Sequence, residues 1–134
     1  GEPVWRDGSQ PIFKQAVENL LMKIIEFSPN QAQPIEMFNS VSASSVHLGD
    51  GNGEVHVYCI YFESGSQIGT HPTGYGQLFL VMNGEGWVVG SDGERIKLKT
   101  GQGAFFEPGE LHSKGSDIGM TVIMVQVSEL KPKL

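Results

Sequence analysis

The chain has 134 residues, enough for one domain with one core, and its 39% hydrophobic content excludes a chain that is disordered throughout. Its formal net charge of −6 disfavours nucleic-acid binding, because an acidic surface repels phosphate backbones. No apolar run approaches the roughly 20 residues of a membrane helix, so we expect no membrane association. The 18 glycines favour turns and short strands over helices.

The N-terminal segment predicts a helix. Ser9 can cap a helix over residues 10–21, and Pro11 is tolerated in its first turn. The apolar residues recur at helical spacing and form one face, comprising Phe13, Ala16, Val17, Leu20 and Leu21. We therefore expect residues 1–22 to form a helical extension that packs on the domain or on a second subunit, and residues 23–134 to form the domain itself.

Two features favour a cytoplasmic protein. The N-terminal stretch carries charges where a signal peptide would be apolar, so we expect no secretion signal. The single cysteine, Cys59, cannot form an internal disulfide, which fits a reducing compartment.

The rest of the chain has the pattern of strands. The segments rich in β-branched or aromatic residues lie at 23–27, 45–48, 55–62, 78–82, 86–90, 95–99, 104–106 and 120–127. Turn signals separate many of them, at 49–53, 83–86, 91–94 and 108–110. The pairs Asn83-Gly84 and Asp92-Gly93 predict tight hairpins. This series of short strands predicts an antiparallel sandwich or barrel without a second domain.

A first motif runs from Gly65 to Gly84. His71 follows Gly65 after five residues, Thr73 follows His71 after one, Gln77 follows Thr73 after three, and Gly84 closes the motif after six more. This spacing resembles the first cupin motif, G-x5-H-x-H-x3,4-E-x6-G. Threonine stands in place of the second histidine, and glutamine stands in place of the glutamate.

A second motif lies in the segment GQGAFFEPGELHSKGS, which begins at Gly101. It resembles the second cupin motif, G-x5-P-x-G-x2-H-x3-N, and keeps Gly109 and His112 at the expected positions. Glu107 replaces the first proline, and Ser116 replaces the final asparagine. Both motifs occur in order with a predicted hairpin between them.

The chain thus resembles a small single-domain cupin, and the resemblance covers roughly residues 23–127. It implies an all-β fold, a double-stranded β-helix (cupin jelly-roll) barrel, here with a short N-terminal helix. It also implies a pocket between the two motifs. Small cupins commonly pair through their sheets, so the resemblance and the apolar helical face together predict a homodimer.

In metal-binding cupins, three histidines and one glutamate converge on a divalent ion. This chain keeps two of these positions, His71 and His112, with Gln77 as a weak third donor. The hydroxyl of Thr73 is a poor ligand, and an amide oxygen brings no charge. We therefore expect a ligand pocket lined by His71, Thr73, Gln77 and His112, and any divalent metal (Zn, Mn, Fe or Ni) to be weakly held.

Other residues compete for the metal role without motif support. His56 can line the barrel if its face of the strand 55–62 points inward. His47, Glu107 and Glu110 are further candidates. For the two histidines, the simpler interpretation is a strand histidine bonded locally or exposed to solvent.

Alternation also assigns the faces of the strand 78–82. The first motif turns Gln77, Phe79 and Val81 inward and leaves Leu78, Leu80 and Met82 outside. Phe79 then belongs to the core rather than to a substrate platform. Trp87, just past the predicted hairpin, is either part of the barrel wall or a pocket aromatic.

Three functions stay open. The first, which the missing ligands favour, is a cupin that binds a small molecule without a tightly held metal. The second is a metal-dependent enzyme, dioxygenase-like or isomerase-like by the resemblance, with Glu107 or Glu110 as a base. The third is a regulatory or structural dimeric barrel. Cupins host many chemistries, so the fold alone does not choose among these functions.

Overall fold

The computed structural model describes residues 22–134, and the expected helix over residues 10–21 lies outside them. Within the described part, the chain forms ten β-strands and one short 3-10 helix, η1 (Pro29–Gln31), and no α-helix. No helix among these residues is long and apolar enough to span a membrane. The predicted all-β class is confirmed.

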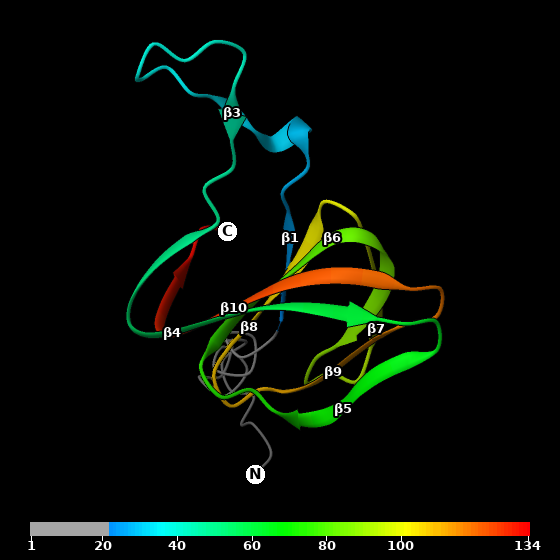
Figure 1. Cartoon of the computed structure of the whole chain (residues 1–134). Helices are drawn as coiled ribbons and strands as arrows, with labels where there is room; N and C mark the ends of the chain where they lie inside the picture. The colour runs from blue at the N-terminus through cyan, green and yellow to red at the C-terminus, as the bar shows by residue number, and fades with distance from the viewer. Residues whose placement is uncertain (1–21) are drawn as a thin grey trace, which may run out of the picture.

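The strands form two antiparallel layers (Figure 1). The main sheet has the order β1 (Lys23–Glu26), β8 (Gln102–Phe106), β6 (Gly76–Val89), β10 (Met120–Pro132), β4 (Gly49–Phe62). The second layer holds β5 (Ser66–Pro72), β9 (Leu111–Ser116), the end of β6 and β7 (Arg95–Lys99). Strand β6 belongs to both layers and joins them into one sandwich.

The hairpin predicted at Asn83-Gly84 is wrong, because the two expected strands on either side are one strand, β6. Gly84 has a φ of 82°, and a Cβ atom there would lie 2.3 Å from the carbonyl oxygen of Gly119. The pairing of β6 with β10 also shifts register between Thr121 and Val122. The shift leaves Met82 as the extra residue of a bulge, two positions before Gly84. At this bulge and the positive-φ glycine, β6 passes from one layer to the other, where β7 and β9 pair with its second half.

The hairpin predicted at Asp92-Gly93 is confirmed. It connects β6 to β7, with the N–H of Gly93 donating to the carbonyl of Gly90 at 3.1 Å. The turn predicted at 49–53 is wrong, since these residues extend β4 and pair with the end of β10.

Strands β5 and β9 were not predicted, because their sequences SQIGTHP and LHSKGS are polar and lack the β-branched signal. They pair with each other across most of their lengths. The strand predicted at 45–48 is reduced to β3 (Ser44–Ser45), which pairs with β2 (Gln33–Pro34). These two short strands lie in an arm, residues 28–48, that projects from the sandwich (Figure 1).

Two apolar clusters pack the main sheet on its opposite faces. The inner cluster fills the sandwich and comprises Phe62, Phe79, Val81, Val88, Leu98, Ala104, Phe106, Met120 and Val122. The outer cluster comprises Ile25, Leu78, Leu80 and Phe105. The predicted alternation along β6 is therefore confirmed, and Phe79 is core with no exposed surface. Met82 points outward and stays 48% exposed.

Candidate functional site

The pairing of β5 with β9 places His71 directly opposite His112. Their Nε2 atoms lie 3.1 Å apart, so one ring donates to the other. The Nδ1 atom of His71 lies 2.6 Å from the carbonyl oxygen of Gly69, which can only accept a hydrogen bond. A neutral His71 therefore carries its proton on Nδ1 and accepts at Nε2, and His112 donates from Nε2.

This tautomer leaves a lone pair on Nδ1 of His112. The His112 side chain is 1% exposed, and its Nδ1 atom is buried without a hydrogen-bond partner among the described residues. Burial, together with the smaller effects of the nearby Lys114 and His71, lowers the pKa of His112 to about 3. His112 is consequently neutral at physiological pH, with an unused acceptor inside the sandwich.

The second motif also delivers a residue that the motif comparison missed. Lys114 follows His112 by two positions on β9, so both side chains point into the sandwich. Its Nζ atom donates to Oε1 of Gln77, which comes from the facing layer on β6. Both side chains are buried, with 1% of Lys114 and 2% of Gln77 exposed. Strand alternation starting from His112 would have located this lysine.

The surroundings of Lys114 are apolar. Its Nζ atom lies 4.7 Å from the ring centroid of Phe79, 5.1 Å from that of Phe106 and 3.9 Å from the sulfur of Met124. No carboxylate of residues 22–134 forms an ion pair with it. Burial lowers the pKa of Lys114 to about 7. We call His71, Gln77, His112 and Lys114 the inner polar cluster.

Thr73 lies outside this cluster. Its hydroxyl donates to the carbonyl of Glu110 at 2.7 Å, and its backbone N–H donates to the same oxygen at 2.8 Å. Thr73 thus fastens the end of β5 to the turn before β9, and its hydroxyl proton is not available to a ligand.

Glu110 also has a structural role, because its side chain bonds to the backbone. Its carboxylate, 3% exposed, accepts hydrogen bonds from the backbone N–H groups of Met22, Ser91 and Glu107 at 2.8, 3.3 and 3.3 Å. Burial raises the pKa of Glu110, although these three hydrogen bonds oppose the rise. The geometry connects three segments of the chain and gives no support to Glu110 as a base.

The remaining histidines bond locally, as the simpler interpretation predicted. His56 lies 2.9 Å from a carboxylate oxygen of Glu54 and stacks against Tyr58 and Tyr75, with ring centroids 6.4 and 6.2 Å away. His47 lies 2.9 Å from a carboxylate oxygen of Asp50.

These donors form an incomplete set for a divalent metal. The two imidazoles are close enough to share an ion, but Gln77 directs its oxygen to an ammonium group, and Thr73 is engaged elsewhere. Residues 22–134 contain no group of three histidine, cysteine, aspartate or glutamate side chains that could hold a metal. A buried ammonium beside the imidazoles would also repel a cation.

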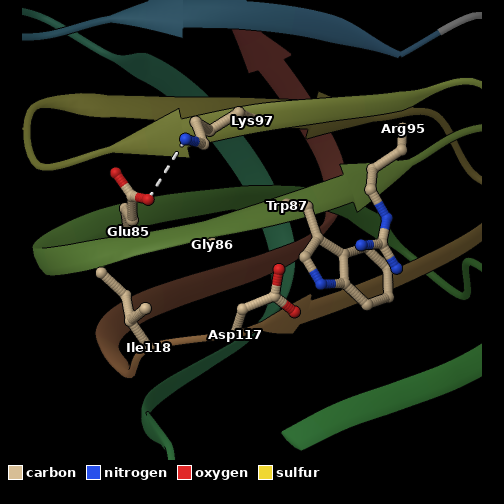
Figure 2. A pocket seen from close by; sticks show the side chains of 7 residues that line it. All are labelled: Glu85, Gly86, Trp87, Arg95, Lys97, Asp117 and Ile118. Atoms are coloured by element: carbon tan, nitrogen blue, oxygen red, sulfur yellow. Dashed lines mark ion pairs between the residues drawn. The ribbon is translucent and has the colours of Figure 1, made fainter. Parts of the chain in front are cut away.

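A separate hollow of about 140 Å³ lies on the outer face of the second layer (Figure 2). Trp87 forms part of its lining, and the guanidinium of Arg95 lies 4.0 Å from the Trp87 ring centroid. Lys97 and Glu85 form an ion pair of 3.3 Å at its rim. Trp87 is therefore covered by an arginine on the outside of the sandwich and does not face the inner polar cluster.

The comparisons with solved structures concern the fold. A cupin superfamily protein from Desulfitobacterium hafniense is 13% identical, with a TM-score of 0.52 over 71% of this chain and 90% of that one. A conserved protein of unknown function from Streptococcus pyogenes is 17% identical, with a TM-score of 0.53 over 62% and 69%. Salicylate 1,2-dioxygenase from Pseudoaminobacter salicylatoxidans is 19% identical, with a TM-score of 0.52 over 59% of this chain but only 24% of the dioxygenase.

Sequence comparison identifies the family. No curated protein sequence matches the chain. Residues 54–129, more than half of the chain, match the family model described as AraC-like ligand binding domain. This match and the solved cupin structures confirm the cupin fold that the two motifs predicted. The chain belongs to the family of AraC-like ligand binding domains.

Proposed function

We propose that the chain binds a small molecule in the inner polar cluster without the help of a metal ion. The family description supports ligand binding. The observation that carries the site is Lys114, a buried ammonium that donates to Gln77 and has no acidic partner among the described residues. Buried charges are ordinarily paired, so an unpaired one within a family of ligand-binding domains marks where a ligand is bound.

The strand order supports a route to this cluster. Among the described residues, β4 pairs only with β10 and β5 pairs only with β9, so each has a free edge. Tyr58 shares the inward face of β4 with the core residue Phe62, yet it is 48% exposed. Tyr58 lies opposite Met124, which contacts Lys114. The proposed entry for a small molecule is therefore beside Tyr58.

A thermal-shift screen tests the proposal. The probes are sugars, amino acids and small organic acids, measured with the parent, Lys114→Met and the control Lys97→Met. A ligand at about 100 times its Kd adds roughly 2.7 kcal/mol, or on the order of 10 °C for a domain of this size. We expect this shift in the parent and the control, and its loss in Lys114→Met. Equal shifts in all three proteins would contradict the proposed site.

A weakly held divalent metal is the second candidate, with the metal-dependent enzyme as its consequence. The observation that favours it is the 3.1 Å approach of the His71 and His112 Nε2 atoms. Removing the ammonium with Lys114→Met and restoring a carboxylate with Gln77→Glu tests whether this pair can hold a metal.

We also propose a homodimer. The outer face of the main sheet carries a groove of about 410 Å³ whose apolar lining includes Leu78, Leu80, Val125 and Val127. Val55, which also lines the groove, and Val57 on the same strand β4 are 54% and 62% exposed. The projecting arm bears further exposed apolar side chains, namely Met37, Phe38 and Val41. A second copy that contributes its arm would cover these surfaces reciprocally, as two-fold symmetry requires.

The remaining proposals concern extent and location. The domain is proposed to span residues 23–134, because β1 begins at Lys23 and β10 runs to Pro132. We retain a cytoplasmic location, since Cys59 is a free, exposed thiol and the chain has no other cysteine with which to pair.

A further inference from the structure

We infer that the ligand is a small organic acid whose single carboxylate pairs with the Lys114 ammonium. This inference rests on the proposed function and names the class of ligand for the same site. The ammonium takes the part that a metal ion plays in a metal-binding cupin, as the fixed positive charge inside the sandwich.

First, the Lys114 ammonium has more hydrogen-bond donors than its neighbours have acceptors. An ammonium has three N–H donors, and the described residues offer one good acceptor, Oε1 of Gln77. The Met124 sulfur at 3.9 Å is a weak acceptor, and the Phe79 and Phe106 rings contribute only their faces. A carboxylate would accept the remaining donors and neutralise the charge in a site where water is scarce.

The second step is the charge of the site. Lys114 is the one lysine or arginine of the cluster, and its partner Gln77 is an uncharged amide. A single carboxylate balances a single ammonium. A phosphate dianion would leave an excess negative charge against Phe79 and Phe106, neither of which has exposed surface.

The third step concerns the rest of the ligand. The half-exposed Tyr58 lies opposite Met124 on the neighbouring strand, and the Phe79 and Phe106 rings flank the ammonium. These aromatic side chains favour an apolar or aromatic body. The buried, unpartnered Nδ1 atom of His112 is a second unmet polar group of the same cluster and can accept from a hydroxyl of the ligand.

The test compares each acid with its neutral amide. Sodium acetate, butyrate, benzoate and 3-hydroxybenzoate and their amides are titrated by calorimetry at pH 6 and matched ionic strength into the parent, Lys114→Met and Lys97→Met. We expect at least one acid to bind the parent at least 30-fold more tightly than its amide. The ratio of the amide Kd to the acid Kd should fall to about one in Lys114→Met. It should persist in Lys97→Met, because the Lys97 side chain is 75% exposed and lies outside the cluster.

Each other outcome has one meaning. If the amides bind the parent as tightly as their acids, the inference that the ligand is a carboxylate is wrong, but the proposed function is still supported. The same holds if no acid binds while a neutral compound of the thermal-shift panel does. If nothing in either panel binds the parent, both the inference and the proposed function fail. If Lys114→Met does not fold, Lys114→Gln replaces it, and the comparison of acid with amide in the parent decides without either variant.

Discussion

Replacing Lys114 by methionine should stabilise the folded chain at neutral and acidic pH. Methionine has nearly the same length and shape, carries no charge and suits the apolar surroundings of Phe79 and Phe106. The pKa of Lys114 falls from 10.5 to about 7 on folding, which corresponds to a cost of about 5 kcal/mol when the lysine is charged in both states. Losing the hydrogen bond to Gln77 costs about 1–3 kcal/mol. The net stabilisation expected at pH 6 is therefore about 2–4 kcal/mol.

The pH dependence of this effect has a definite sign. The folded-state pKa of Lys114 lies below its unfolded value, so between about pH 7 and 10.5 the unfolded chain binds the extra proton. The stability of the parent therefore rises with pH across this window, because the cost of the buried charge disappears. The methionine variant has no ammonium and therefore lacks this pH-dependent cost. Its advantage over the parent should shrink by about 3 kcal/mol between pH 6 and pH 9.

Urea unfolding at pH 6, 7, 8 and 9 measures the difference, because all other titrating groups are common to both proteins. Lys97→Met serves as the control: its side chain is 75% exposed, and we expect a change within about 0.5 kcal/mol that does not vary with pH. A constant difference between parent and Lys114→Met from pH 6 to pH 9 would refute the buried-charge reasoning, whatever the sign of that difference.

Three further predictions concern a close glycine contact, the dimer and metal binding. Gly115→Ala should destabilise the fold by about 1–3 kcal/mol in urea unfolding, because its Cβ would lie 2.4 Å from Cζ2 of Trp87 and 2.6 Å from the carbonyl oxygen of Ser66; an unchanged midpoint would contradict this packing. Light scattering should report a dimer at micromolar concentration that Val57→Lys weakens at least tenfold, and a monomeric parent would count against the proposed interface. Gln77→Glu combined with Lys114→Met should bind Mn²⁺ at least tenfold more tightly than the parent, since it completes a set of two histidines and one carboxylate. Equal Mn²⁺ affinity in parent and variant would contradict the assigned effect of Gln77 and Lys114.

Sequence patterns predicted the parts of the fold that local chemistry specifies. Alternation along the strand correctly assigned Phe79 to the inner face of the sheet and Leu80 to the outer face. It did so because the direction of each side chain follows from its position in the strand. The prediction failed at Gly84, which has the positive φ of a turn glycine but lies within one long strand. Whether an Asn-Gly pair closes a hairpin or continues a strand depends on partners that are distant in sequence, here β10.

The candidate site was predicted as far as the motif positions extend. His71 and His112 were expected to meet, and the register of β5 against β9 brings their rings into contact. Thr73 was grouped with them, but its hydroxyl is directed to the Glu110 carbonyl, a contact made between two loops that no spacing encodes. Lys114 was missed because the motif assigns no role to its position, although its place two residues after His112 determines the direction of its side chain.

Gln77 and Lys114 both differ from the metal-binding cupin pattern, and the two differences are related. In the metal-binding pattern that the motifs resemble, a divalent cation and one glutamate leave a net charge of about +1 inside the barrel. Here the glutamate position is the neutral Gln77, and its oxygen accepts from Lys114, so below about pH 7 the same interior again holds one positive charge. Either change alone would disturb this balance, because glutamate would neutralise the lysine and a metal would be repelled by it. An interior that keeps its positive charge without a metal can still attract an anionic ligand. For this reason we propose ligand binding, rather than metal chemistry, as the function of these residues.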